Sequence, residues 1–350
     1  MGSENLPEDC QTEEKGLNTF EKYLAIWVGL CMILGIVFSQ VFPWISPVIN
    51  SLSFAGISIP IGIALFVMMY PALLNLDFGE MQKLRDRPWP IVLTLVSNWL
   101  IAPFIAASLA NIFLQGYPQL IVAVILLGSS PCTAMVLVWG YLCQGNQEQN
   151  FIITSINTVS ILILYAPLVA FYTAIQAIII DYTLLFLSVV LFIGAPLIAG
   201  IVSKRYLIAK KGSDWFHGVY RPVVGKMAIL ALLATLVILF SLNGLVLIQN
   251  PLLLVLVSIP LLLGFAIVVV YNIFTTRIMG FEYRQAIITV IIGSSSHFEI
   301  AIATAVSLYG VGSLAALGTT MGLFWEVPIM LGLVYLGKAL NRRKFWKSRR

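Results

Sequence analysis

Long apolar stretches separated by short polar segments make up most of this chain. Ten of these stretches are long enough to cross a bilayer as helices, at about 1.5 Å per residue. They lie near residues 21–42, 57–74, 91–113, 120–142, 151–175, 182–202, 227–247, 252–274, 286–308 and 314–336. The pattern therefore predicts an all-α polytopic membrane protein with ten transmembrane helices.

The positions of the basic residues support this count. With ten spans, all 20 Lys and Arg fall on one side of the bilayer, at the two termini and in the loops that follow even-numbered spans. The loops on the opposite side contain none; these lie near 43–56, 114–119, 176–181, 248–251 and 309–313. The positive-inside rule then predicts a cell-membrane protein with both termini in the cytoplasm. Topology accounts for the net charge of +5, so this charge does not indicate nucleic-acid binding.

Composition agrees with a membrane class, since 60% of residues are hydrophobic, 10% are charged and the mean hydropathy is +0.97. No segment fits the phosphate-binding Gly-x-x-x-x-Gly-Lys-Ser/Thr loop, so transport driven by this chain's own ATP hydrolysis is not expected. The four cysteines have neither zinc-site nor disulfide-framework spacing. We therefore expect no cofactor.

The two halves of the chain resemble each other. Gly-Ser-Ser occurs at 128–130 and again at 293–295, each time inside a long apolar stretch, and the same offset of 165 residues carries Gly35 onto Gly200. Five spans per half would insert the second half upside down, which gives a 5+5 inverted repeat with discontinuous helices 4 and 9. Broken helices are tolerated in a bilayer only inside protein or beside a water-filled cavity, and they are typical of secondary carriers.

The predicted organisation follows from this repeat. It comprises a disordered cytoplasmic tail over 1–19, a first five-helix repeat over 20–175, an inverted second repeat over 176–338 that includes a basic and aromatic cytoplasmic linker over 203–226, and a basic cytoplasmic tail over 339–350.

Few side chains at membrane depth can ionise. Glu299 and Glu326 are the only acids there and His297 is the only imidazole. Because a charge in the bilayer interior costs a few kcal/mol, such residues are functional candidates. Glu326 either pairs with a donor from the broken helices or shapes the kink expected at Pro328. Asn98 either lines a polar path or binds an ion, or it forms an interhelical hydrogen bond.

Cys132 and Glu299 each follow one of the Gly-Ser-Ser sequences. Ser130-Pro131-Cys132 predicts the N-cap and first two residues of a half-helix, whose positive end would favour a thiolate. The alternative is that the cysteine is a small apolar filler. Ser296-His297-Phe298-Glu299 fits a capping box, which is compatible with a carboxylate that also takes up a proton.

A hydrolytic triad of Ser295, His297 and Glu299 is a weaker interpretation. A spacing of two residues rotates a helix by about 200°, so these three side chains would not share one helix face. No Gly-x-Ser-x-Gly elbow accompanies them. We therefore do not expect an enzyme.

Several motifs resemble those of the arsenite efflux permease family, the arsenical-resistance carriers of the bile acid/arsenite/riboflavin transporter superfamily. They are Met68-Met69-Tyr70-Pro71, Asn98-Trp99, Pro103-Phe104, Pro131-Cys132-Thr133-Ala134-Met135-Val136, Val138-Trp139, Phe298-Glu299-Ile300-Ala301-Ile302-Ala303 and Glu326-Val327-Pro328. The resemblance implies an essential thiol at Cys132 and an essential carboxylate at Glu299. It also implies a core in which spans 4 and 9 cross, moving against a panel of spans 1, 2, 6 and 7. The chain departs from the family at Ser296-His297, where an asparagine usually precedes Phe-Glu.

The chemistry of the substrate fits these residues. Trivalent arsenic and antimony bind sulfur and form neutral hydroxides near pH 7, so their path needs no Lys or Arg. A single thiol among hydroxyl groups also allows release; these neighbours are Ser129, Ser130, Thr133 and Ser295. The sequence thus predicts efflux of arsenite, or antimonite, in exchange for protons. Cys132 and His297 would lie at the substrate, and Glu299, Glu326 or Asn98 would take part in ion coupling.

Two alternatives stay open. A sodium-coupled symporter for an organic anion such as a bile acid would need sodium and would leave Cys132 without a role. A membrane receptor or scaffold would bind without accumulating solute in vesicles. The sequence does not decide between arsenite and antimonite, between proton and sodium coupling, or between oligomeric states.

Overall fold

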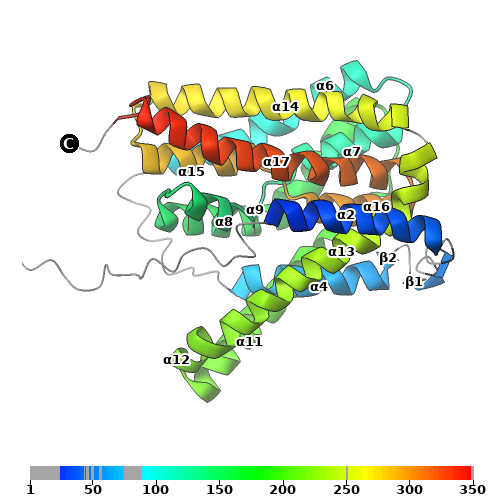
Figure 1. The fold of residues 1–350 in the computed structure, drawn as a ribbon, viewed down its shortest axis with the longest axis horizontal. Coiled ribbons are helices and arrows are strands. Elements are labelled where there is room, and N and C mark those ends of the chain that lie inside the picture. The colour runs from blue at the N-terminus through cyan, green and yellow to red at the C-terminus, as the bar shows by residue number, and fades with distance from the viewer. Residues whose placement is uncertain are drawn as a thin grey trace, which may run out of the picture.

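The computed structural model describes residues 24–42, 44, 47–48, 51–54, 57–74, 88–133, 135–249 and 251–347. Within these residues the chain is built almost entirely of helices packed side by side (Figure 1). The predicted tail over 1–19 lies outside the described residues, as do residues 348–350.

The helices, in chain order, are α2 (Leu24–Val41), α4 (Ile59–Leu74), α5 (Trp89–Val96), α6 (Ala102–Phe113), α7 (Pro118–Gly128), α8 (Met135–Leu142), α9 (Gln147–Ile175), α10 (Tyr182–Val189), α11 (Ala195–Lys211), α12 (Ser213–Trp215), α13 (Arg221–Gln249), α14 (Pro251–Ile278), α15 (Tyr283–Ser294), α16 (Phe298–Tyr309) and α17 (Leu314–Arg342). π-Helical segments at Ser97–Ile101, Val190–Gly194 and Phe216–Tyr220 join α5 to α6, α10 to α11 and α12 to α13. A short antiparallel hairpin, β1 (Ser53–Phe54) with β2 (Ile57–Ser58), precedes α4.

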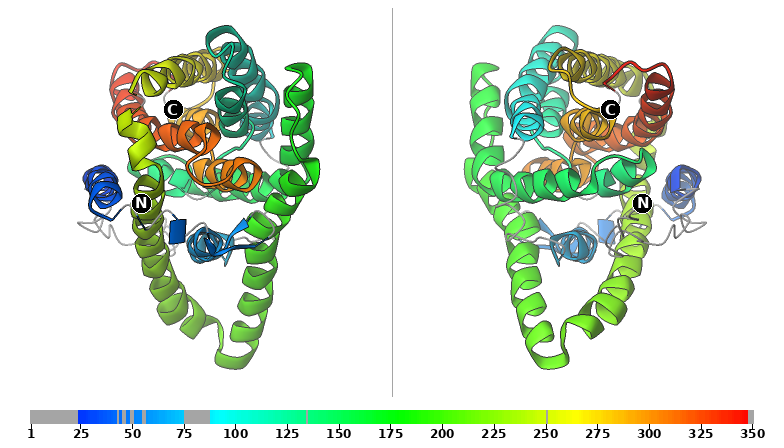
Figure 2. Two further views of the ribbon diagram at one scale, coloured as in Figure 1. Left: turned by 90° about the vertical axis from the view of Figure 1, so that its right-hand side faces the viewer. Right: turned by 90° about the vertical axis from the view of Figure 1, so that its left-hand side faces the viewer.

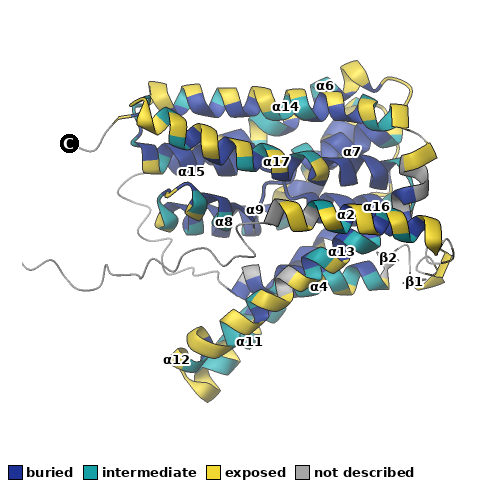
Figure 3. Cartoon of the chain, viewed as in Figure 1, coloured by how far each residue is buried: buried dark blue, intermediate teal, exposed yellow. Residues whose placement is uncertain are grey.

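Six helical segments of the described chain are long and apolar enough to cross a membrane: Trp89–Phe113, Gln147–Ile175, Tyr182–Lys211, Ser213–Leu242, Pro251–Ile278 and Leu314–Arg342. Shorter apolar helices cover Gly29–Val41, Ile59–Pro71, Pro118–Gly128 and Phe298–Tyr309. Apolar side chains such as Ile163, Ile198 and Leu252 are exposed. Exposed positions lie along the outer faces of the helices (Figure 3). Exposed apolar faces of this extent indicate contact with lipid. The predicted class, an all-α multi-pass membrane protein, is confirmed, while the arrangement of ten spans in two repeats stays a prediction.

The helices pack as two bodies. In the first body, which we call the panel, α11 and α13 diverge from α12 as the arms of a V, and α4 lies between them (Figure 2). Helix α2 packs along α13. The second body, which we call the core, contains α5–α9 and α14–α17. The panel thus contains helices of predicted spans 1, 2, 6 and 7, but α10 (the first part of predicted span 6) packs against α9 and α16 of the core.

Glycines bring α2 and α13 into close contact. A Cβ atom at Gly35 would lie 2.6 Å from the Cβ of Phe240 and 2.8 Å from the backbone oxygen of Val237. Small residues at helix interfaces let membrane helices approach in this way. Gly29, on the same helix, has no neighbouring atom within 4 Å of the corresponding position in the described structure.

We expect Gly35→Ala to lower the stability of the protein by about 1–3 kcal/mol, because the added methyl group must push α13 away. Gly29→Ala is the matched control, and its midpoint of thermal unfolding should stay at or above that of the parent chain. Thermal unfolding of the detergent-purified variants measures both effects. Equal midpoints for the two variants would contradict the close contact between α2 and α13.

The segment predicted as a linker, 203–226, is helical in the structure. Helix α11 continues to Lys211, Gly212 makes the turn with φ of +86°, and α12 begins at the next residue. The hydroxyl of Tyr70, on α4, donates to Ser203 Oγ at 2.5 Å and lies 2.8 Å from the hydroxyl of Tyr220. The segment therefore forms the tip of the V and is tied to α4.

The segment predicted as a C-terminal tail, 339–350, also packs against the bundle as far as it is described. Helix α17 continues to Arg342. Trp346 is buried, and its Nε1 donates to Thr276 Oγ1 at 3.1 Å. The guanidinium of Arg277 lies 4.1 Å from the centre of the Phe345 ring. These contacts hold the segment to the end of α14.

Candidate functional site

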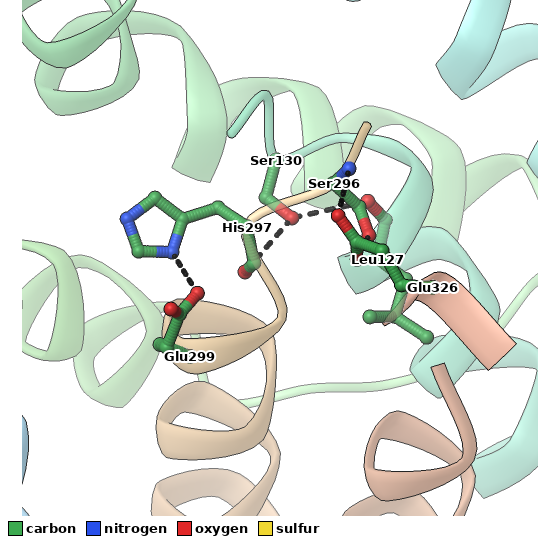
Figure 4. A network of polar contacts seen from close by, with 6 residues as sticks. All are labelled: Leu127, Ser130, Ser296, His297, Glu299 and Glu326. Atoms are coloured by element: carbon green, nitrogen blue, oxygen red, sulfur yellow. Dashed lines mark hydrogen bonds and ion pairs between the residues drawn. The ribbon is translucent and has the colours of Figure 1, made fainter. Parts of the chain in front are cut away.

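Two helical segments of the core are interrupted by non-helical residues. A first break, residues 129–133, follows α7, and a second break, residues 295–297, separates α15 from α16. The breaks begin at the two copies of Gly-Ser-Ser and lie against each other (Figure 4). We call the place where they meet the crossing.

Backbone hydrogen bonds join the two breaks. Pro131 and Ser296 form an isolated antiparallel bridge. The N–H of His297 donates to the backbone oxygen of Ser130 at 2.6 Å, and Ser130 Oγ donates to the backbone oxygen of His297 at 3.3 Å. Each break thus satisfies backbone groups that the other helix leaves unpaired, as membrane depth requires.

Cys132 lies in the first break and is 1% exposed. The prediction that Pro131 and Cys132 begin the second half-helix is wrong, because α8 begins at Met135. The bridge to Ser296 holds the backbone of the first break outside the helical conformation at Pro131. The thiol is therefore carried by a non-helical segment next to the second break.

Glu326 holds the second break in place. The N–H of Ser296 donates to Glu326 Oε1 at 3.1 Å, and Ser296 Oγ donates to Oε2 at 2.6 Å (Figure 4). Glu326 comes from α17 and is 3% exposed. The prediction that this acid pairs with a donor from the broken helices is confirmed.

Glu299 pairs with His297 instead of capping its helix. His297 Nδ1 lies 2.9 Å from Glu299 Oε2, and both residues are buried. His297 is the N-cap of α16 and makes no side-chain cap bond. The predicted capping box is wrong, because Ser296 directs its hydroxyl to Glu326. The sequence argument that His297 and Glu299 would not share one helix face does not apply, because His297 precedes the first residue of α16.

The alternative hydrolytic arrangement is not formed. Ser295 Oγ donates to the backbone oxygen of Ile292 at 3.4 Å, so its hydroxyl proton is engaged by the backbone of α15. A nucleophile activated by histidine requires a hydrogen bond between the two side chains.

One hollow and one cavity lie near the crossing. Glu299 lines a narrow hollow with Leu65, Met69, Phe192 and Ile300, which places its carboxylate where the core meets α4 of the panel. A separate cavity of about 60 Å³ lies between α6, α7, α14 and α17, and residues 294–296 form part of its wall. Residues of the second break thus line the cavity, and Glu299, on the helix that follows this break, lines the hollow.

The remaining candidates lie in or near the crossing. Ser129 and Thr133 are buried in the first break. Asn98 is 3% exposed in the π-helical segment Ser97–Ile101, and its Nδ2 has no hydrogen-bond partner among the described residues. Both interpretations of Asn98 stay predictions.

Sequence reasoning missed Asn272 and Ser97, whose side chains link α14, the segment between α5 and α6, and the end of α15. Asn272 Nδ2 donates to Ser97 Oγ at 2.8 Å and to Ser294 Oγ at 3.2 Å. Ser97 Oγ in turn donates to the backbone oxygen of Gly293 at 2.9 Å. The available signal was a polar residue inside an apolar stretch, but other polar residues such as Asn98 and Ser258 share it, and it does not reveal the partner.

We expect Glu326→Ala to lower the stability of the protein by about 1–3 kcal/mol, because it leaves the buried N–H and hydroxyl of Ser296 without acceptors. Ser296→Ala removes only the hydroxyl and should cost less. Thermal unfolding of the two purified variants compares these effects. If Ser296→Ala is the more destabilising change, Glu326 does not hold the second break.

A polytopic helical bundle in which two broken helices meet in the interior is the architecture of a membrane transporter. Comparison with known proteins identifies the family, since the sodium bile acid symporter family matches residues 60–250. The chain belongs to this family and is a transporter, not an enzyme.

Relatives in this family resemble the chain over nearly its full length. The uncharacterized transporter slr0944 of Synechocystis is 38% identical, covering 95% of this chain and 91% of that protein. The arsenical-resistance protein Acr3 of Alkaliphilus metalliredigens is 35% identical over 99% of this chain and 98% of that protein. Acr3 of Corynebacterium glutamicum is 28% identical, with coverages of 94% and 92%. The resemblance inferred from the motifs is confirmed.

Proposed function

We propose that this protein exports trivalent arsenic across the cell membrane in exchange for protons, with Cys132 contacting the metalloid and Glu299 carrying the coupling proton. The observation that carries the proposal is the crossing, where the break that contains Cys132 is bonded to the break that precedes Glu299. Two relatives named as arsenical-resistance proteins support the choice of solute.

The chemistry of the crossing suits a neutral arsenic hydroxide. When the sulfur of Cys132 replaces one hydroxyl group of the metalloid, that hydroxyl leaves as water with the thiol proton. The other hydroxyl groups need neutral donors and acceptors, which Ser129, Ser130 and Thr133 provide beside the thiol. Antimony forms the same kind of hydroxide and would be carried by the same groups.

Glu299 is suited to proton coupling by its position. It lines the hollow between core and panel, and movement of one body against the other would change its access to water. His297 faces this carboxylate, with Nδ1 at 2.9 Å from Glu299 Oε2, so the imidazole is within reach of the proton that Glu299 would carry. The apolar side chains of Leu65, Met69 and Phe192 face the same hollow and place no further charge there.

The order of the helices supports a ten-span inverted repeat. A shift of 165 residues carries α7 onto α15, α9 onto α17, and the first break onto the second. An odd number of spans in each half reverses the direction of the second half. With the basic residues on one side, this topology places both termini in the cytoplasm.

Sodium-coupled uptake of an organic anion is the second candidate, favoured by the family's description as sodium bile acid symporters. Transport into everted vesicles decides between the two. With an acidic vesicle interior, arsenite and antimonite should accumulate without sodium, and collapse of the pH gradient should stop accumulation. Accumulation that requires sodium and ignores the pH gradient would contradict proton exchange.

A further inference from the structure

Asn157, on α9, has an unusual environment. It is 0% exposed, and neither Nδ2 nor Oδ1 has a hydrogen-bond partner within the part of the chain that the structure describes. Leaving a buried polar group unpaired costs about 1–3 kcal/mol, so such groups call for an explanation. By contrast, the side chain of buried Asn150 donates to the backbone oxygen of Val136 at 3.1 Å.

Contacts on either side of Asn157 fix its level along the bundle. Towards the start of α9, Gln149 Nε2 donates to Thr289 Oγ1 of α15 at 3.2 Å. Further along, the hydroxyl of Tyr165 lies beside that of Thr304 of α16. The segment α15–α16 therefore runs in the same direction as α9, and Asn157 is midway between the two contacts. At about 1.5 Å per helical residue, the second break lies about 12 Å back along the chain from Thr304, and Asn157 lies about as far back from Tyr165.

The first break lies at the same level. Asn150 contacts Val136 at the start of α8, and α8 runs back against α9 after the short turn that joins them. From Val136 the chain leads back into the first break and to Cys132. Because α8 is antiparallel to α9, this is the same direction along the bundle as from Asn150 to Asn157 on α9. Asn157 is therefore level with both breaks.

Neighbouring polar groups on α9 are already used. Thr154 Oγ1 donates to the backbone oxygen of Asn150 at 2.7 Å, and Thr158 Oγ1 donates to that of Thr154 at 2.8 Å. Asn157 retains both donors and its acceptor. Ser129 Oγ, in the first break, is likewise buried without a partner among the described residues.

We infer that Asn157 is a solute-binding residue of the crossing, whose carboxamide exchanges hydrogen bonds with the hydroxyl groups of a neutral, hydroxylated solute. The identity of that solute rests on the proposed function. A carboxamide matches hydroxyl groups because both donate and accept, and it adds no charge to a path for a neutral molecule. Binding would satisfy the amide that is unpaired without solute.

The test compares Asn157→Leu with Asn272→Leu, in arsenite transport by everted vesicles and in thermal unfolding of the purified proteins. Leucine has a similar size and removes an unpaired amide, so Asn157→Leu should unfold at the same or a higher temperature than the parent chain. Its kcat/KM for arsenite should fall at least about tenfold. Asn272→Leu loses the bonds to Ser97 and Ser294 and should unfold at a lower temperature.

Two results would overturn the inference. One is parental kcat/KM in Asn157→Leu, and the other is a loss of thermal stability in this variant as large as that of Asn272→Leu, since the amide would then be structural. If leucine prevents folding, Asn157→Ala is measured against the same criteria. A parent chain that does not transport arsenite would instead refute the proposed function, and with it the solute assigned to Asn157.

Discussion

Replacement of Cys132 by serine or alanine is expected to reduce arsenite uptake into everted vesicles at least about tenfold. A tenfold reduction corresponds to the loss of about 1.4 kcal/mol of binding free energy. The thiol supplies a soft sulfur ligand for trivalent arsenic, and a serine hydroxyl of nearly the same size does not. Because Cys132 is buried within the first break, whose backbone is bonded to the second break, the change to serine should leave the fold intact.

The other described cysteines provide the controls. Cys31 lies on α2 in the panel and is half-buried, so Cys31→Ser should transport arsenite at the parental rate. Burial raises the pKa of the Cys143 thiol, beyond the end of α8, to about 12, which keeps this thiol protonated and unreactive. Full uptake by Cys132→Ala, in vesicles that contain as much protein as the parent, would exclude a role for the thiol.

Glu299→Gln is expected to abolish the dependence of arsenite uptake on an imposed pH gradient. Glutamine keeps the size and the acceptor oxygen of the side chain but does not exchange a proton. Arsenite uptake with and without an acidic vesicle interior should then be equal. It should be no faster than movement of arsenite down its own concentration gradient. The comparison is made in the same vesicles as for the parent chain.

Glu326→Gln is the matched control for this result. Both oxygens of Glu326 already accept hydrogen bonds from Ser296, which indicates a structural role for this acid. We therefore expect Glu326→Gln to retain a response to the pH gradient. Loss of that response in Glu326→Gln, together with its retention in Glu299→Gln, would transfer the coupling role from Glu299 to Glu326.

Much of the fold could be predicted because membrane helices carry a strong signal over many residues. The two Gly-Ser-Ser sequences marked both breaks correctly, since the same three residues recur at one offset inside two long apolar stretches. The pairing of Glu326 with a broken helix was one of two interpretations open from the sequence, because a buried acid needs a donor and the breaks supply free backbone N–H groups.

Local rules for helix ends failed at the same breaks. The predictions for Ser130-Pro131-Cys132 and for Ser296 with Glu299 assumed that each half-helix caps itself. In the structure each break is satisfied by the other break or by α17, through contacts between residues far apart in sequence. The sequence likewise did not reveal the roles of Asn157 and Asn272, since the role of a buried amide depends on which residues of other helices it contacts.

The arsenic K-edge absorption spectrum of the purified protein with bound arsenite tests the central claim most directly. The account predicts that arsenic has sulfur and oxygen neighbours in the parent chain, and only oxygen neighbours in Cys132→Ser. Retention of the sulfur signal in Cys132→Ser, or its absence from the parent chain at saturating arsenite, would contradict the assignment of the crossing as the metalloid site.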